Sequence, residues 1–117
     1  MTTSGGNDRA DVLGDRCDRL GGAVVALMTA LLEAQGAPRR SATVLPLVGR
    51  VRAVAELGAE GVDDEAYRRW AAGAPGNLDA IEEALRADDA DGAWRAFSDQ
   101  EVGVVLLARA CAGRPGW

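Results

Sequence analysis

Three neighbouring side chains and one distant carboxylate are the residues best suited to recognition or chemistry. Tyr67, Arg68 and Trp70 lie in one short segment. Aromatic rings and guanidinium groups are enriched at recognition surfaces because they bury a large area and donate forked hydrogen bonds. Glu101 stands before an apolar segment, where a carboxylate can gain a raised pKa and act as a base. We therefore predict that Tyr67, Arg68 and Trp70 bind substrate and that Glu101 is catalytic.

Each of these residues also has a structural interpretation. Tyr67 and Trp70 are three residues apart, so on a helix both rings can pack inward while the arginines stay in solvent. The segment Ser98-Asp99-Gln100-Glu101 matches the S-x-x-E capping box. This match predicts that Ser98 caps the last helix and that Glu101 has a structural role there. Both interpretations stay open at the level of sequence.

The chain contains no histidine and no lysine. Without histidine there is no Ser–His or Cys–His catalytic pair, and the commonest ligand of metal sites is missing. Without lysine the chain cannot form a Schiff base with a carbonyl substrate or hold pyridoxal phosphate. The phosphate-loop and dinucleotide-binding glycine motifs are absent as well. The sequence therefore predicts no cofactor.

The acidic segment Asp88–Gly92 invites comparison with a calcium loop. If Gly92 is aligned with the invariant glycine of an EF-hand, Ala87 and Ser98 occupy the first and twelfth positions, which require carboxylates. We therefore predict a solvated loop between helices and no metal site.

Two cysteines, Cys17 and Cys111, lie near opposite ends of the chain. They form no CxxC motif and have no histidine nearby, so they do not indicate a metal site. Each stands among apolar residues of a predicted helix, where a reduced cysteine behaves as a small hydrophobic residue. We expect two buried free thiols rather than a disulfide.

The 117 residues, of which 48% are hydrophobic and 26% charged, correspond to one globular domain over residues 8–117, after a disordered leader at 1–7. The net charge of −5, with arginines interleaved among acids, argues against nucleic-acid binding. The longest uncharged stretch, Leu20–Leu32, is too short to span a bilayer. The aspartates before it do not fit a signal peptide. The prediction is a cytoplasmic protein that binds no nucleic acid and no membrane.

No segment alternates with the period of a strand, so the predicted fold class is all-α, a compact bundle of five or six helices with a long N-terminal helix. The N-terminal helix ends at Gln35-Gly36-Ala37-Pro38, with Gly36 in the left-handed C′ position. A turn is predicted at Ala74-Pro75-Gly76-Asn77. The other predicted helices follow Ser41 or Thr43, Asp63, Asn77 and Ser98 as N-caps, and one short helix carries Trp94 and Phe97.

The N-terminal helix carries an apolar seam with the 4-3 spacing of coiled coils. Its members are Leu13, Cys17, Leu20, Val24, Leu27 and Leu31. Because so small a chain cannot enclose a deep pocket, we expect this seam to pair in a homodimer, with the binding surface at or near the subunit interface. The predicted core consists of Cys17, Leu20, Val24, Leu27, Val51, Val54, Leu85, Val105 and Leu106.

In its size, its helical layout, its lack of histidine and its short helix with Arg68 and Trp70, the chain resembles the small lysinoalanine-forming proteins of cinnamycin- and duramycin-type lanthipeptide clusters. The resemblance implies a helical dimer that folds a modified peptide so that a lysine amine adds to a dehydroalanine, with the substrate supplying part of the acid–base chemistry. Such a reaction depends on positioning more than on catalytic side chains. The alternative function is a non-catalytic helical dimer that acts as a regulator, adaptor or immunity-type binder. A bundle that binds a small molecule is a third possibility.

Overall fold

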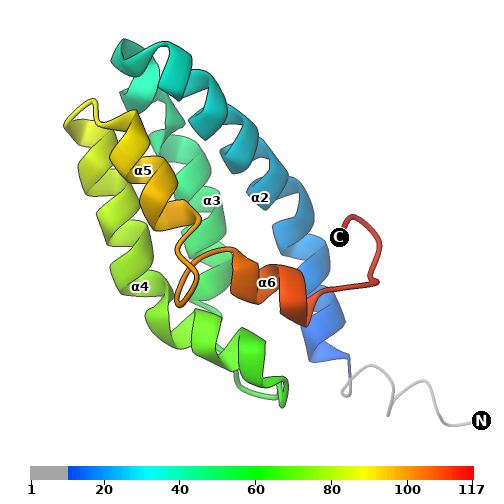
Figure 1. The fold of residues 1–117 in the computed structure, drawn as a ribbon. Helices are drawn as coiled ribbons and strands as arrows, with labels where there is room; N and C mark the ends of the chain where they lie inside the picture. Colours follow the sequence, from blue (N-terminus) through cyan, green and yellow to red (C-terminus); the bar gives the residue numbers. More distant parts are fainter. Residues whose placement is uncertain (1–10) are drawn as a thin grey trace, which may run out of the picture.

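The structure is a computed structural model and describes residues 11–117, which form five α-helices and one 3-10 helix (Figure 1). The elements are α2 (Val12–Gly36), η1 (Pro38–Val44), α3 (Leu45–Ala55), α4 (Glu65–Arg86), α5 (Ala90–Phe97) and α6 (Val105–Ala110). Residues 11–117 contain no β-strand, which confirms the all-α prediction. The predicted leader at 1–7 lies outside the described residues.

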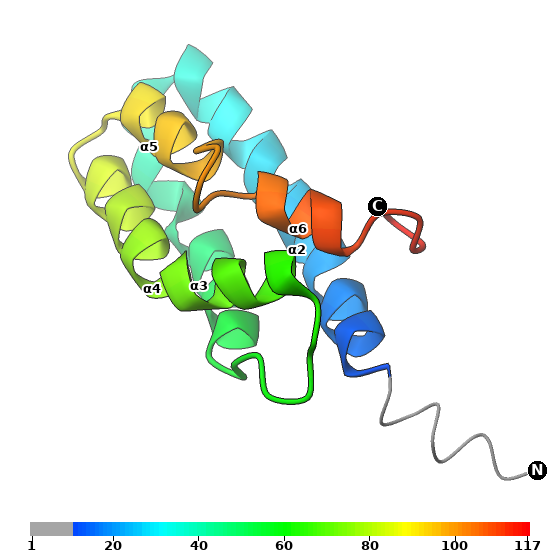
Figure 2. The same ribbon diagram turned by 60° about the horizontal axis from the view of Figure 1, so that its bottom comes forward.

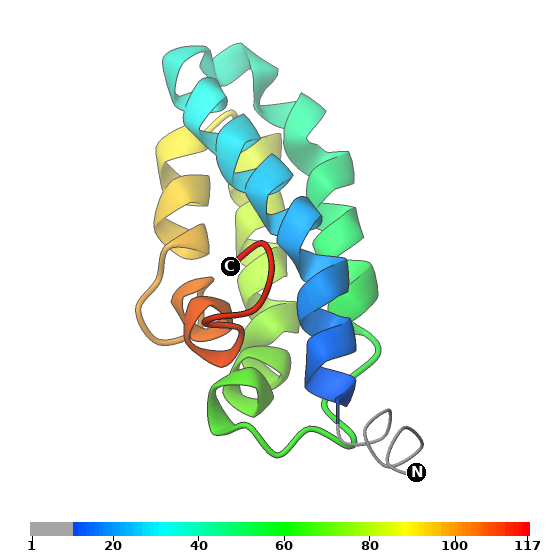
Figure 3. The same ribbon diagram turned by 90° about the vertical axis from the view of Figure 1, so that its right-hand side faces the viewer.

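Four helices pack in a ring around the core. Helix α2 contacts α3 and α5, and α4 contacts the same two helices from the other side. Helix α6 packs against α4 and runs across the direction of the longer helices (Figures 1 and 2). Helix α2 lies on the outside of the bundle over its whole length (Figure 3).

The apolar seam of α2 faces this core. Five of its six predicted members are buried, and Leu13 is partly buried. The buried seam residues are Cys17, Leu20, Val24, Leu27 and Leu31. Because these side chains are covered by elements of the same chain, the seam no longer provides a reason for a homodimer.

The end of α2 and the start of α3 differ in detail from the prediction. Gly36 belongs to the helix, which ends at Ala37, with φ −150° and ψ 74°. Gly36 has no positive φ and so does not take the predicted left-handed conformation. Neither Ser41 nor Thr43 caps an α-helix. Both side chains donate hydrogen bonds within the 3-10 helix η1, to the carbonyls of residues 38 and 40. Pro46 lies in the first turn of α3.

Helix α4 replaces two predicted helices, because the chain stays helical through Pro75. The predicted turn at Ala74-Pro75-Gly76-Asn77 is therefore wrong. The part of α4 before Pro75 lies at an angle to the part after it (Figures 1 and 2), which is the usual effect of a proline inside a helix. Asp64, and not Asp63, is the N-cap of α4, and its carboxylate accepts a hydrogen bond from the Tyr67 N–H at 2.9 Å.

The segment between α5 and α6 corrects the predicted capping box. Ser98 ends α5, and its hydroxyl donates to the Trp94 carbonyl at 2.7 Å. The Asp99 carboxylate accepts hydrogen bonds from the backbone N–H groups of Glu101 and Val102. Helix α6 begins at Val105 without a side-chain cap. Ser98 is therefore the C-cap of α5 and not the N-cap of the last helix, and Glu101 has no capping role.

A disulfide joins α2 to the end of α6. Cys17 and Cys111 are bonded to each other, with their Cα atoms 5.7 Å apart, and both are fully buried. The expectation of free thiols is therefore wrong. The C-terminal segment is held to α2 by two further contacts. The Trp117 indole N–H donates to the Cys17 carbonyl at 2.9 Å, and Arg114 pairs with Asp11 at 3.0 Å.

The remaining predicted core positions lie inside the bundle, except that Val105 is only partly buried. The acidic segment around Asp89 is a helix start, because the Asp89 carboxylate accepts a hydrogen bond from the Gly92 N–H at 2.9 Å. Among residues 11–117, no group of three or more carboxylate or cysteine side chains is arranged to hold a metal ion. No helix in that range is long and apolar enough to cross a membrane.

Candidate functional site

The two aromatic residues of the predicted binding group belong to the core. Tyr67 is 0% exposed and Trp70 is 3% exposed. Their ring centroids are 5.6 Å apart, with the planes tilted by 51°. The structure thus follows the inward-packing interpretation for both rings, and neither ring is offered to a ligand at the surface.

Arg68 and Glu101 lie at the surface, on different elements. The Arg68 guanidinium donates to the Val62 carbonyl at 3.2 Å, which ties α4 to the loop before it. Glu101 is exposed on the segment between α5 and α6. The four predicted site residues are therefore divided between the core and two parts of the surface.

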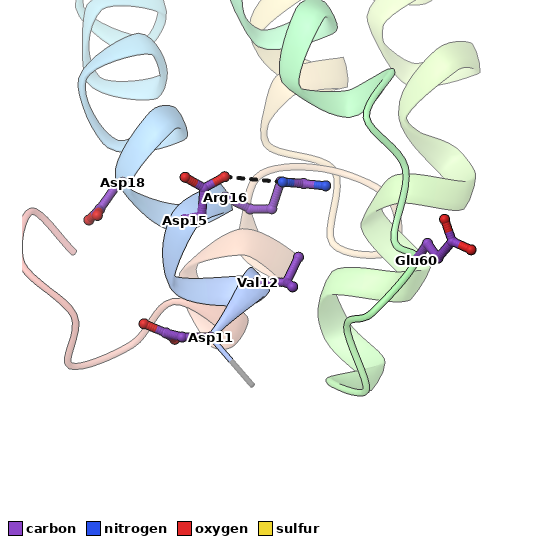
Figure 4. Close-up of a pocket in the computed structure, with 6 residues that line it drawn as sticks. All are labelled: Asp11, Val12, Asp15, Arg16, Asp18 and Glu60. Carbon is purple, nitrogen blue, oxygen red and sulfur yellow. Dashed lines mark hydrogen bonds and ion pairs between the residues drawn. The ribbon is translucent and has the colours of Figure 1, made fainter. Parts of the chain in front are cut away.

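An open recess of about 600 Å³ lies at the beginning of α2. It is lined by Asp11, Val12, Asp15, Arg16, Asp18 and Glu60. Val12 and Arg16 point toward the loop that carries Glu60, whereas Asp11 and Asp18 project from the other side of α2 (Figure 4). The four carboxylates are thus spread around one helix end and do not converge on a single point.

Helix geometry explains why three of these acids lie together. Asp11, Asp15 and Asp18 are spaced by four and three residues, which places them on one face of the first turns of α2. Asp11 is also the N-cap, since its carboxylate accepts from the Gly14 N–H at 3.2 Å. Carboxylates at this end also stabilise the helix, because their negative charge interacts favourably with the positive end of the helix dipole.

Two of the four carboxylates are already neutralised by arginines. Asp15 accepts from Arg19 at 2.9 Å and from Arg16 at 3.1 Å, and the hydrogen bond from Arg19 lowers the pKa of Asp15 below its usual value. Asp11 is paired with Arg114. Asp18 and Glu60 form no ion pair with any residue in the range 11–117. No arginine in that range engages these two carboxylates, which leaves them open to a ligand.

Arg16 lines the recess and also has a buried polar atom. The Arg16 side chain is 14% exposed, and its Nε atom is buried without a hydrogen-bond partner. The Tyr67 hydroxyl is also buried without a partner. Burial raises the pKa of Tyr67 above its usual value, and the positive charge of Arg16 only partly opposes this effect. Of the predicted site residues, Tyr67 is therefore the one whose hydroxyl is influenced by a recess-lining side chain, Arg16.

The arrangement suits recognition of a positively charged group. Carboxylates attract ammonium and guanidinium groups by charge-assisted hydrogen bonds, and these carboxylates stand at a partly open surface where a chain can enter. Their spread around the helix end fits an extended cationic segment better than a single ion.

Asp15, Arg16, Asp18 and Glu60 were not predicted as site residues from the sequence. The signal for the three aspartates on α2 was present in their spacing along a predicted helix. Glu60 carries no such signal, because its position depends on how the loop before α4 folds against α2. Comparison of the chain with known protein families, with curated proteins and with solved structures finds no match.

Proposed function

We propose that this protein binds a short, positively charged peptide through the recess at the start of α2 and positions it for an intramolecular crosslink. The specific reaction is the one implied by the resemblance to lysinoalanine-forming proteins. The lysine amine nitrogen adds to the β-carbon of a dehydroalanine, the electrons of the double bond move to the α-carbon, and that carbon takes up the proton released by the amine.

The observation that carries the proposal is the pair of carboxylates without an arginine partner, Asp18 and Glu60, at the recess. Because Asp18 and Glu60 lie on different sides of the helix end, they would hold an extended cationic segment at two points. The lysine that reacts must lose its ammonium proton to solvent before its nitrogen can attack, and its proximity to the dehydroalanine then contributes a large part of the barrier reduction. The addition needs no cofactor, because no atoms are lost and no electrons are transferred. The predicted base Glu101 is not among the recess-lining residues, so the proposal relies on positioning.

The experiment uses a peptide that contains one lysine and one dehydroalanine. The crosslink leaves the mass of the peptide unchanged, so the reaction is quenched with a thiol, which adds only to unreacted dehydroalanine and increases its mass. We expect the fraction of peptide that resists the thiol to grow faster with the protein than without it. The Asp18→Asn/Glu60→Gln variant should lose most of this acceleration.

The matched control is Glu56→Gln/Glu83→Gln, which removes two other carboxylates that do not line the recess. This control should keep the acceleration. Equal rates with and without the wild-type protein would contradict the crosslinking proposal. A rate that falls in Glu101→Gln but not in Asp18→Asn/Glu60→Gln would contradict the placement of the site at the recess.

The second candidate function is a non-catalytic binder, as a regulator, adaptor or immunity-type protein. Burial of Tyr67 and Trp70 favours it, because two of the residues predicted to contact a substrate are engaged in packing. Binding of a cationic peptide through Asp18 and Glu60 without any crosslink would select this function.

The disulfide bears on where the protein works. Structural disulfides persist in oxidising compartments and are rare in the cytosol, so the Cys17–Cys111 bond favours an oxidising compartment over the predicted cytoplasmic location. Alkylation of the thiols in freshly broken cells, followed by mass spectrometry, distinguishes the two. Unmodified, bonded cysteines indicate the oxidising compartment, and two alkylated cysteines indicate the cytoplasm.

A further inference from the structure

Helix α2 carries a second stripe on the face opposite its buried seam. The positions Asp18, Gly22, Val25, Thr29, Leu32 and Gly36 are spaced by four and three residues in alternation, and this is the spacing that keeps side chains on one helix face. Every one of these residues is exposed. We call them the outer stripe. Helix α2 therefore has two parallel stripes with coiled-coil spacing, one covered by its own chain and one uncovered.

The outer stripe is apolar in its central part. Val25 is 50% exposed and Leu32 is 49% exposed, and Met28, which flanks the stripe, is 36% exposed. Between Arg19 and Glu33 the helix carries no charged residue. Several large hydrophobic side chains are exposed among residues 11–117, and most of them lie on this face of α2. In Figure 3 no other element covers this stretch of α2, and the C-terminal segment passes over the helix nearer its beginning.

Opposite charges lie at the two ends of the stripe. Asp18 lies at the beginning of α2 and forms no ion pair with residues 11–117, whereas its neighbour Asp15 is paired with Arg16 and Arg19. Arg39 and Arg40 lie in η1, directly after the end of α2. Asp18, Arg39 and Arg40 are exposed. A second copy aligned antiparallel would therefore bring the acidic end of each α2 to the basic end of the other, whereas a parallel alignment would place like charges together.

We propose that the outer stripe is the interface of an antiparallel, two-fold symmetric homodimer of this chain. In the register that centres the stripe on the symmetry axis, Leu32 packs over Gly22 of the partner subunit, and Val25 packs over Thr29 of the partner subunit. In the Leu32–Gly22 layers a large side chain thus meets a glycine, which lets the two helices approach closely there. Arg39 then lies near Asp15 of the partner subunit.

This inference does not depend on the proposed peptide reaction. The dimer expected from the buried seam is replaced by one that uses the opposite face of the same helix. The recess at the start of α2 would then border the interface. Because one helix face is smaller than the roughly 800 Å² per partner of a standard interface, we expect association in the micromolar range or weaker.

Sedimentation equilibrium of the full chain from about 1 μM to about 1 mM tests the proposal. We expect the mass to rise from that of a monomer toward twice that value. The Val25→Glu/Leu32→Glu variant should remain a monomer over the whole range. Leu57→Glu, which charges another exposed hydrophobic residue that is 48% exposed and lies outside α2, is the matched control and should dimerise like the wild type.

A charge exchange tests the antiparallel orientation. The Asp15→Arg/Asp18→Arg and Arg39→Asp/Arg40→Asp variants should each dimerise at least tenfold more weakly than the wild type, because like charges then meet. An equimolar mixture of the two should form the heterodimer in preference to either homodimer. Circular dichroism and thermal melting confirm that each variant is folded. A wild-type protein that is monomeric at about 1 mM, or folded stripe variants that dimerise normally, would overturn the proposal.

Discussion

At the scale of single residues, the acid before α4 is a measurable determinant of stability. The Asp64 carboxylate satisfies the Tyr67 N–H, one of the helix-start donors that have no partner within the helix. We expect Asp64→Ala to lower the free energy of unfolding by about 1 kcal/mol. Urea denaturation measures the change. Asp63→Ala is the control, because its neighbour Asp64 is the N-cap, and equal losses in the two variants would contradict this assignment.

Tyr67 provides a pH-dependent prediction. Burial raises its pKa, so above a pH of about 10 the unfolded chain loses the phenolic proton while the native protein retains it. The unfolded state is then favoured, and stability falls as the pH rises from about 10 to the native pKa of Tyr67. Below about 10 both states are protonated and this contribution to the pH dependence is absent.

The titration of Tyr67 can be followed directly, because it is the only tyrosine. The chain has no lysine, the other side chain that ordinarily titrates in this pH range. We expect tyrosinate absorbance of the native protein to appear at a higher pH than in the urea-unfolded chain. Tyr67→Phe should flatten the alkaline loss of stability and cost little at neutral pH, because the hydroxyl has no hydrogen-bond partner to lose. A native titration that coincides with that of the unfolded chain would contradict the burial of this hydroxyl.

At the scale of elements, two glycines with different surroundings should respond in opposite directions. A Cβ at Gly76 in α4 would meet no atom within 4 Å, whereas one at Gly103 would lie 2.5 Å from the Asp99 and Phe97 carbonyl oxygens. We expect Gly76→Ala to stabilise the protein by up to about 1 kcal/mol through helix propensity. Gly103→Ala should destabilise it, because the backbone would have to shift. Thermal melting of both variants tests this, and a stabilised Gly103→Ala variant would contradict the close packing before α6.

Helix α4 shows why local sequence signals led to a wrong prediction for part of the fold. Proline and glycine inside a helix cost about 3 and about 1 kcal/mol relative to alanine, which made a turn the natural prediction at Pro75-Gly76. The apolar spacing, however, continues unbroken across this point. Its members are Tyr67, Trp70, Ala74, Leu78, Ile81 and Leu85, all of them buried. Burial of this continuous apolar face stabilises the helix by more than the proline and the glycine cost. The apolar spacing on both sides of Pro75, taken together, indicates one continuous helix.

Asn77 illustrates a contact that sequence could not supply. Its side chain resembles a helix cap, but in the structure its amide donates to the Ala96 carbonyl at 2.8 Å and ties α4 to the end of α5. The long seam of α2 was predictable because it depends only on spacing along one helix. The Asn77 contact and the position of Glu60 at the recess depend on the relative placement of separate elements.

At the scale of the whole molecule, the disulfide is the strongest single constraint on the chain. Cys17 and Cys111 are separated by 94 positions, and closing a loop of that length lowers the entropy of the unfolded chain enough to stabilise the fold by about 4–5 kcal/mol. We expect Cys17→Ser/Cys111→Ser to unfold at a markedly lower urea concentration than the oxidised protein. Reductant should have no effect on that variant.

The same comparison tests the bond itself. Wild-type protein in reductant should approach the stability of the double-serine variant. Equal stability of oxidised and reduced wild-type protein would show that the bond contributes nothing. The pairing was not predictable from the sequence, because two cysteines among apolar helical residues favoured the interpretation as packed thiols. Only the approach of the end of α6 to α2 brings them together.

The central claim is that the acidic recess at the start of α2 binds a cationic peptide segment. Amide chemical shifts of the labelled full chain, recorded while a lysine-containing peptide is added, test it most directly. We expect the shifts to move at residues 11–18 and around Glu60. The movement should be lost in Asp18→Asn/Glu60→Gln and with a peptide whose lysine is replaced by norleucine. Shifts that move instead around Arg68 or Glu101, or no movement up to about 1 mM peptide, would contradict it.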